Sequence, residues 1–542
     1  MKMRFLAIFM ALVLCLGCFA LVSCDNTVDV DDETEDNADA GNEKNPAETT
    51  TGKTEDKTEG KTEANTEGNT EGNTEGKTEA NTEGNTEGNT EANTEGKTEP
   101  PVTNVGEGYD GSPVTITFYH TMGSNLSDVL NAYIVEFNKL YPNITINHSQ
   151  VGGYDDVREQ IATEITVGNQ PNIAYCYPDH VAMYNISKAV YPLDSLIAST
   201  VEITRADGTV ERMGLTQRQI NDFIAGYYNE GKQFGDGKMY TLPLSKSTEV
   251  LYYNATFFAE HNLTPPTTWD EMEALCAKIL EIDPDCIPLG YDSESNWFIT
   301  MCEQLGTPYT SATGEHFLFN TEANREFVKE FKTWFEAGYV TTQEIYGAYT
   351  SGLFVATTGQ RSYMSIGSSA GATHQRPKKD NSGNYPFEVG ITTIPQANPA
   401  EPKVISQGPS LCIFDKADKQ EVYASWLFMK FLTTNVDFQA EFSMASGYVP
   451  VLKSVAKNEV YKTQFLDKAD GGDYISALSA KVCLDQVDAY YTSPAFNGSS
   501  VARDEVGKLI QNCFAAEATE ATVDEIIKKL FEEAVEKCKY LS

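Results

Sequence analysis

The first stretch of the chain with a clear folding pattern begins near residue 114. Val114, Ile116 and Phe118 alternate with Thr115 and Thr117, which is the period of a strand with one buried face. The alternation predicts a β-strand over these residues.

The spacing of apolar residues changes after Gly123-Ser124. The helix should end before Pro142, and Ile144 and Ile146 begin a second alternating strand. A strand, a helix and a strand within about 35 residues have the size of a parallel crossover unit. The apolar positions of the predicted helix are Leu126, Val129, Leu130, Tyr133, Phe137 and Leu140.

Helical patterns continue to alternate with strand patterns further along. Thr268 and Glu271 have the spacing of a capping box, and Met272, Leu275 and Ile279 follow on one helical face. Because both patterns recur along the body, the predicted fold class is α/β.

The N-terminus has the pattern of an export signal. Lys2 and Arg4 precede an apolar stretch from Phe5 to Val22, and Cys24 follows small residues. Leu21-Val22-Ser23-Cys24 resembles the bacterial lipobox, so residues 1–23 are expected to be removed and Cys24 to be lipidated. The alternative is an uncleaved membrane anchor. Either reading places the protein outside the cytoplasm, held at the bacterial cell membrane.

Residues 24–108 are predicted to be a disordered tether rather than a domain. A four-residue unit of Thr, Glu, Gly or Ala, and Asn or Lys repeats there, and residues 25–108 contain 24 acidic and six basic side chains. Such a segment buries too little apolar surface to offset its chain entropy. A role of the repeat in sugar or metal binding is left open.

Charge and composition narrow the function further. The 542 residues include 79 acidic and 40 basic side chains, for a net charge of −39, so a nucleic-acid partner is not expected. The six histidines and the body cysteines have no metal-ligand spacing, and no cofactor or metal is expected. The spacing of Cys276, Cys286 and Cys302 leaves a local disulfide open. The body from 109 to 542 is expected to act as a monomer.

Three stretches of the body resemble the family 1 extracellular solute-binding proteins, which are receptors of ATP-driven (ABC) importers for sugars and glycerol phosphates. The stretches are Tyr240-Thr-Leu-Pro-Leu-Ser-Lys-Ser-Thr-Glu-Val-Leu-Tyr-Tyr-Asn254, Val404-Ile-Ser-Gln-Gly-Pro-Ser-Leu411 and Ala445-Ser-Gly-Tyr-Val-Pro-Val451.

The resemblance implies a type II periplasmic-binding-protein-like fold, with two α/β lobes joined by crossing hinge strands. The first lobe would hold about 109–247 and 409–446, and the second about 249–405 and 449–542. It further implies that a small polar ligand is enclosed between the lobes and that the closed form docks on ABC permease subunits.

The resemblance also implies a set of ligand-binding residues. Trp297 lies in a polar stretch and would stack on a sugar, with core packing as the alternative. Asp179 stands one place later than the acidic residue of relatives that bind glycerol 3-phosphate, because Pro178 intervenes. Ser500 stands where those relatives carry an Arg for phosphate. The full set is Tyr154, Asp179, Ser247, Trp297, Ser368, Ser369, Gly408, Tyr448 and Ser500.

Because Ser cannot replace the two parallel hydrogen bonds of an Arg, a neutral sugar or oligosaccharide is the preferred ligand. Glycerol 3-phosphate or a glycerophosphodiester is the alternative. An enzyme is not expected: Gly367-Ser-Ser-Ala-Gly371 fits the G-x-S-x-G motif of serine hydrolases, but the only later histidine is His374, which is too close to complete a triad. A surface adhesin would explain the anchor and tether but not the three stretches that resemble solute-binding proteins.

Overall fold

The computed structural model describes residues 108–471 and 475–541. The expectations for the signal peptide, for Cys24 and for the tether up to residue 107 lie outside these residues. The strands of the described part form two large mixed sheets and one two-stranded ribbon.

The first sheet has the strand order β2-β1-β3-β13-β6. All seven residues of β1 pair in parallel with β2, from Val114 opposite Ile144 to His120 opposite Gln150. This pairing, with α2 between the two strands, confirms the predicted strand, helix and parallel strand. The bounds are β1 Val114–His120, α2 Ser124–Leu140, β2 Ile144–Gln150, β3 Ile173–Cys176, β6 Thr241–Pro243 and β13 Ser410–Ile413.

The second sheet has the order β14-β12-β7-β10-β8-β9, and β11 also pairs with β7. Strand β7 is antiparallel to β10, β11 and β12, whereas β8 is parallel to both β9 and β10. The bounds are β7 Ser247–Asn254, β8 Leu289–Tyr291, β9 Val340–Thr342, β10 Met364–Ser368, β11 Val389–Thr392, β12 Val404–Gln407 and β14 Tyr490–Tyr491.

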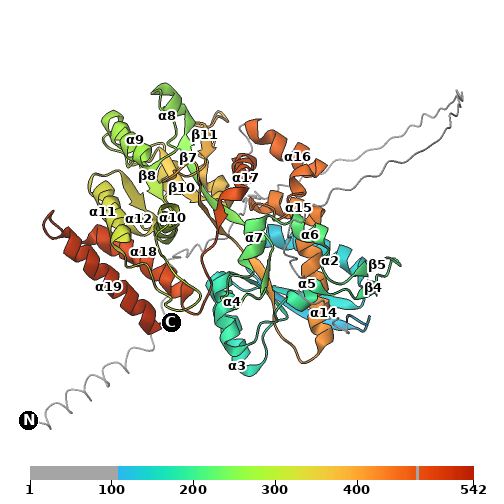
Figure 1. Cartoon of the computed structure of the whole chain (residues 1–542). Coiled ribbons are helices and arrows are strands. Elements are labelled where there is room, and N and C mark those ends of the chain that lie inside the picture. Colours follow the sequence, from blue (N-terminus) through green and yellow to red (C-terminus); the bar gives the residue numbers. More distant parts are fainter. Residues whose placement is uncertain (1–107, 472–474, 542) are drawn as a thin grey trace, which may run out of the picture. The chain divides into compact units, whose positions relative to one another are not determined.

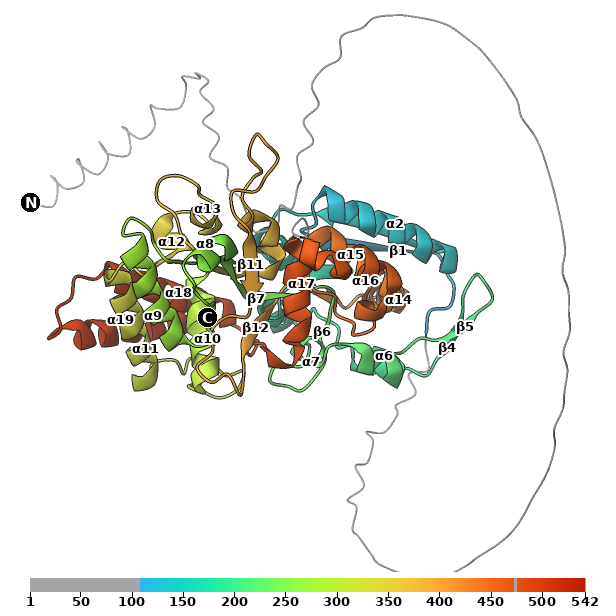
Figure 2. The same ribbon diagram turned by 90° about the horizontal axis from the view of Figure 1, so that it is seen from above.

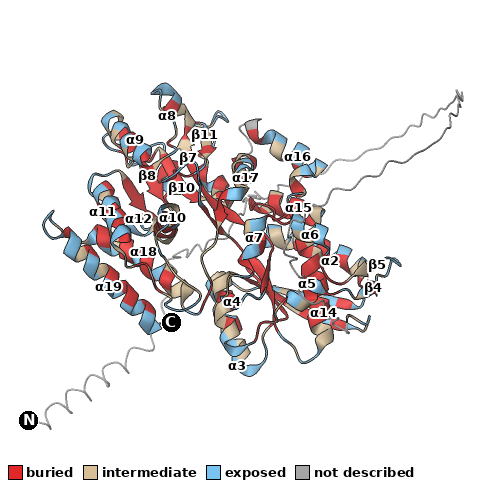
Figure 3. Ribbon diagram, viewed as in Figure 1, coloured by how far each residue is buried: buried red, intermediate tan, exposed pale blue. Residues whose placement is uncertain are grey.

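Helices flank both sheets (Figures 1 and 2). Helix α14 packs on β1 and α2, while α10, α11, α18 and α19 pack on one another beside the second sheet. Figure 3 shows α11 and α19 with one buried and one exposed side, as expected of helices on a sheet, whereas the residues of α14 are all buried or half-buried. The bounds are α9 Trp269–Ile282, α10 Glu294–Leu305, α11 Glu322–Glu336, α14 Lys419–Thr434, α15 Val436–Ser446, α17 Ile475–Asp485, α18 Ser499–Ala515 and α19 Val523–Leu541.

The predicted capping box is confirmed at the start of α9. The Thr268 side chain accepts a hydrogen bond from the backbone N–H of Glu271, and the Glu271 side chain accepts one from the backbone N–H of Thr268. None of the described helices combines the length and apolar character needed to cross a membrane. The described cysteines, including Cys276, Cys286 and Cys302, are buried free thiols.

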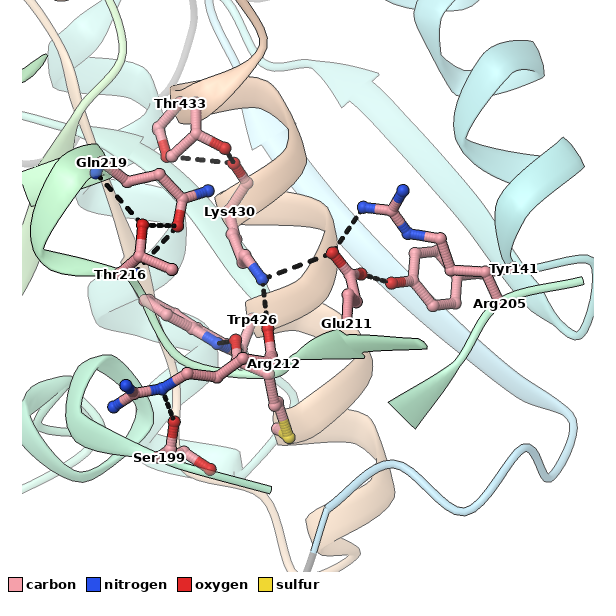
Figure 4. A network of polar contacts seen from close by, with 12 residues as sticks. Tyr141, Ser199, Arg205, Glu211, Arg212, Thr216, Gln219, Trp426, Lys430 and Thr433 are labelled. Atoms are coloured by element: carbon pink, nitrogen blue, oxygen red, sulfur yellow. Dashed lines mark hydrogen bonds and ion pairs between the residues drawn. The ribbon is translucent and has the colours of Figure 1, made fainter. Parts of the chain in front are cut away.

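A charged network fastens the ribbon of β4 (Glu202–Thr204) and β5 (Val210–Arg212) to α14 (Figure 4). The Lys430 ammonium donates to the Arg212 carbonyl at 2.6 Å and lies 3.5 Å from the Glu211 carboxylate. Glu211 also accepts hydrogen bonds from Arg205 and Tyr141. Burial lowers the pKa of Lys430 and raises that of Glu211, and the attraction between the two charges opposes both shifts.

The chain runs directly from one sheet to the other at two segments, and a third segment pairs with the first of them; all three are called the crossing segments here. Residues 244–246 join β6 to β7, and residues 408–409 join β12 to β13. Residues 447–449 follow α15, and Val449 pairs with Lys246 in the first segment. The three crossings therefore meet at one place.

Candidate functional site

A cavity of about 550 Å³ is lined by residues that lead from both sheets, a volume typical of small-molecule sites. Residues after β3 and in α7 (Ala225–Glu230) line it from the first sheet. Residues of β7, β10, β12, α10 and α18 line it from the second. A ligand in this cavity would touch elements of both sheets.

The lining is rich in polar groups that can form hydrogen bonds with the hydroxyl groups of a ligand. Its tyrosines are Tyr177, Tyr309, Tyr349 and Tyr448, its acidic residues are Asp179, Glu230, Glu249 and Asp292, its amides are Asn296, Gln375 and Gln407, and its basic residues are His374 and Arg503.

Five of the nine sequence-predicted residues line the cavity. They come from separate parts of the chain: the start of α4 (Pro178–Tyr184), the start of β7, the end of β10, and two of the crossing segments. The fold therefore brings them to one place. These residues are Asp179, Ser247, Ser368, Gly408 and Tyr448.

Trp297 lies in the core rather than in the lining. It has no exposed surface, and its ring stacks on Phe331 at 3.6 Å and on Tyr291 at 5.0 Å between ring centroids. Its neighbour Asn296 lines the cavity instead, because consecutive helix residues point about 100° apart.

Tyr154 and Ser500 lie close to the cavity without lining it. Tyr154 begins α3 (Tyr154–Val167), and its ring packs 4.3 Å from that of Tyr177, a lining residue. Ser500 lies in the first turn of α18, next to Ser499 and three residues before Arg503, both of which line the cavity. Tyr154 thus supports a lining tyrosine from behind.

Ser369 is fully buried, and its hydroxyl is occupied within the protein. Its Oγ accepts a hydrogen bond from the Thr248 N–H at 3.1 Å, and its carbonyl accepts one from the Ser479 hydroxyl at 3.0 Å. Both contacts hold the end of β10 in place. The serine therefore has a positioning role behind its lining neighbour, Ser368.

A network of buried polar groups forms one wall of the cavity. Glu249 accepts hydrogen bonds from the Tyr291 hydroxyl at 2.7 Å and from Asn296 Nδ2 at 2.9 Å. Asn296 Nδ2 also donates to Gln407 Oε1 at 3.1 Å, and Arg503 donates to Asn296 Oδ1. Burial raises the pKa of Glu249 to about 7, while its two hydrogen bonds and the Arg503 charge oppose the rise.

A second acidic residue, Asp292, holds the chain near Thr350 at another part of the cavity lining. Asp292 Oδ1 accepts hydrogen bonds from the N–H and the hydroxyl of Thr350, at 2.7 and 2.6 Å. These bonds hold the chain around Tyr349, which lines the cavity, against the end of β8.

Sequence reasoning missed the buried polar residues of this lining. Glu249 lies in strand β7, and almost all the other residues of that strand are buried. A charged residue at such a position is rarely fully buried unless it is paired. A charged residue in the middle of an apolar strand pattern could therefore have indicated a buried polar group at Glu249. Arg503, by contrast, falls on a helix where a charged residue is ordinary.

Comparison with known proteins agrees with this fold. A family model described as bacterial extracellular solute-binding protein matches residues 132–466. Because the match covers more than half of the chain, the protein belongs to this family of extracytoplasmic receptors for ABC import. Family membership also makes it a non-enzymatic receptor.

Curated relatives include the sn-glycerol-3-phosphate-binding periplasmic protein UgpB of Salmonella typhimurium. It is 26% identical over 382 residues, which are 66% of this chain and 79% of that protein. The corresponding UgpB of Yersinia enterocolitica is also 26% identical, over 381 residues, 66% of this chain and 78% of that protein.

Solved structures share the fold. The cyclic alpha-maltosyl-1,6-maltose binding protein of Arthrobacter globiformis superposes with a TM-score of 0.60 and 20% identity, over 78% of this chain and 99% of that one. UgpB of Mycobacterium tuberculosis, in complex with glycerophosphocholine, gives 0.60 and 16%, over 79% and 98%. At these identities the superpositions establish the α/β periplasmic-binding-protein fold.

Proposed function

We propose that this receptor delivers a neutral carbohydrate, a sugar or a short oligosaccharide, to its importer. The observation that carries the proposal is the lining, where four tyrosines stand among carboxyl, amide and hydroxyl groups. Aromatic faces pack against the C–H surfaces of a sugar, and planar polar groups replace the water on its hydroxyls. Carboxylate oxygens accept hydrogen bonds from sugar hydroxyls without needing any charge on the ligand.

The charges of the cavity support a neutral ligand over a phosphate. Arg503 already donates to Asn296 and faces Glu249, so its guanidinium is partly committed within the protein. Asp179 and Asp292 add negative charge to the same lining. A phosphate would have to displace the Arg503 contacts and approach these carboxylates, and both steps cost free energy.

Glycerol 3-phosphate or a glycerophosphodiester is the second candidate. Arg503 lies in the cavity although Ser500 occupies the position that the resemblance assigns to a phosphate-binding arginine. One helical turn separates the two positions, so Arg503 is the group that would receive a phosphate. The names of the curated relatives favour the same candidate.

Delivery in this proposal depends on lobe closure. The lobes are residues 109–247 with 409–446 and residues 249–405 with 449–542. A ligand that touches both lobes binds the closed form better than the open one and shifts the population toward it. The closed form then docks on the permease subunits as a monomer.

Membrane attachment through Cys24 belongs to the same proposal. The lipobox-like sequence before this cysteine supports it, and acyl chains on Cys24 would hold the receptor beside its permease. Mass spectrometry of the protein extracted from membranes should find a lipidated Cys24 as the first residue, and Cys24→Ser should prevent that lipidation. Recovery of the protein with its apolar segment uncleaved would contradict lipid attachment at Cys24 and favour an uncleaved membrane anchor.

A thermal-shift panel tests the ligand class. A ligand that binds only the native state raises its melting temperature. Neutral mono- and oligosaccharides should raise it, while sn-glycerol 3-phosphate and glycerophosphocholine should not. Asp179→Asn should weaken binding of the selected sugar about tenfold or more, since a hydrogen bond to a charged group is worth roughly 1.5–3 kcal/mol. Tyr448→Ala should also weaken it, because the aromatic contact with the sugar is lost. Stabilisation by the phosphates alone would favour the second candidate.

A further inference from the structure

A lysine is buried where the three crossing segments meet. Lys246 and its partner Glu230 have side chains that are 0% and 2% exposed, and Nζ lies 2.6 Å from Glu230 Oε1. Nζ also donates to the Gly408 carbonyl at 2.8 Å and to the Ser410 hydroxyl at 3.1 Å. The three N–H groups of the ammonium are thus all used.

The same lysine connects the crossing segments through its backbone. Its N–H donates to the Val449 carbonyl at 3.1 Å, and the Val449 N–H donates to the Lys246 carbonyl at 2.6 Å. Its side chain reaches Gly408 in the second segment. Gly408 has φ +104°, and a Cβ there would lie 3.0 Å from Lys246 Cα, so only glycine fits this close approach. One residue therefore touches all three crossings.

Glu230 brings α7 and the cavity into this arrangement. It is the last residue of α7, a helix that contacts both β6 of the first sheet and β14 of the second. In α7, Tyr227 stacks on Tyr490 of β14 with 4.9 Å between ring centroids. Glu230 also lines the cavity, and its Oε1 accepts from Ser410 as well as from Lys246.

A desolvated pair of this kind contributes little to stability by itself. An apolar pair of similar volume is often as stable, whereas a single buried charge without its partner is strongly unfavourable. What an apolar pair cannot supply is direction, because the ammonium fixes Glu230, Gly408 and Ser410 at defined angles. The charges therefore serve to position these groups rather than to stabilise the fold.

We propose that Lys246 and Glu230 form a hinge clamp that fixes how far the two sheets stand apart in the empty receptor. Both are positioning residues, and Glu230 connects the clamp to the cavity because it also lines the cavity wall. The proposal rests on the proposed receptor function, since a hinge has a use only if the two halves move.

Distances between spin labels in the empty, full-length protein test the clamp. Labels introduced through p-acetylphenylalanine at Glu136 in α2 and Glu532 in α19 report on exposed positions beside the two sheets. The variants are Lys246→Met, Glu230→Gln and the double variant Lys246→Met with Glu230→Leu. We expect the distance distribution to be at least twice as broad in each variant as in the wild type.

The double variant separates a positional role from a stabilising one. It removes both charges, so it should keep the melting temperature close to that of the wild type while the distances stay broad. A stable double variant with a wild-type distribution would overturn the clamp. If a single variant fails to fold, the double variant alone still tests the clamp: a broadened distance distribution supports it, and a wild-type distribution overturns it.

Lys430→Met is the matched control, because it breaks a mostly buried ion pair that lies wholly beside the first sheet. It should lower the melting temperature without broadening the distances. Equal broadening in this control would also overturn the clamp. Since no ligand is added, a failed sugar screen would leave these outcomes unaffected and would count only against the proposed function.

Discussion

Glu249 is the residue whose chemistry the fold changes most clearly in the cavity. Burial raises its pKa to about 7, although Tyr291, Asn296 and Arg503 all favour the ionised form. The unfolded carboxyl titrates near its ordinary value of about 4.3. Between these two pH values the native state holds the proton more tightly, so stability falls as pH rises through about 7.

The first prediction concerns this pH dependence. Raising the pH from 5 to 8 should cost the wild type about 3 kcal/mol more than it costs Glu249→Gln, since each pKa unit corresponds to about 1.4 kcal/mol. Urea unfolding of both proteins at the two pH values measures the difference. Parallel pH profiles would show that Glu249 does not titrate in this range.

The second prediction concerns Trp297. Because its indole is enclosed between Tyr291 and Phe331, Trp297→Ala should destabilise the fold by about 3–5 kcal/mol. Trp297→Phe should recover much of that loss and should leave sugar affinity within about twofold, as small changes away from direct contacts usually do. Calorimetry with the sugar selected by thermal shift measures the affinity. A loss of sugar binding in a stable Trp297→Phe variant would indicate that Trp297 does contribute to the ligand site.

At the scale of elements, the N-terminal cap of α9 offers a third prediction. Thr268→Ala removes the hydroxyl that receives the Glu271 N–H, so it should cost about 1 kcal/mol. Glu281→Ala, an exposed change in the last turn of the same helix, is the control and should stay within about 0.5 kcal/mol. Urea midpoints compare the two. Equal effects would mean that the cap does not hold this helix end.

The elements that the sequence predicted well are those set by local periodicity. The strand at Val114–His120, the helix after it and the cap at Thr268 each depend on side chains a few residues apart. Such patterns follow from the geometry of one strand or one helix. They need no knowledge of the rest of the chain.

The lining of the cavity depends on distant residues, and local patterns do not contain it. Asp179, Ser247 and Tyr448 could be proposed only through resemblance to a family, because no spacing joins them. Polar neighbours suggested a site role for Trp297, but its place in the core depends on which way α10 faces. Glu249 and Arg503 meet through Asn296, and that contact requires β7, α10 and α18 to pack together.

For the whole molecule, charge provides a fourth prediction. The chain carries a net charge of −39, so an anionic ligand would be repelled at long range and its affinity would depend on salt. A neutral sugar should bind with an affinity that changes less than about twofold between low and physiological ionic strength. Calorimetry at several salt concentrations measures this. A steep salt dependence would indicate a charged ligand.

The proposal that the cavity between the two sheets receives a neutral carbohydrate can be tested by calorimetric titration of the full-length protein. The titrants are the sugar selected by thermal shift and, separately, sn-glycerol 3-phosphate. One sugar molecule should bind per chain with an affinity that Asp179→Asn weakens, and the phosphate should give no saturable heat. Saturable binding of the phosphate with no binding of any neutral sugar would contradict the proposal.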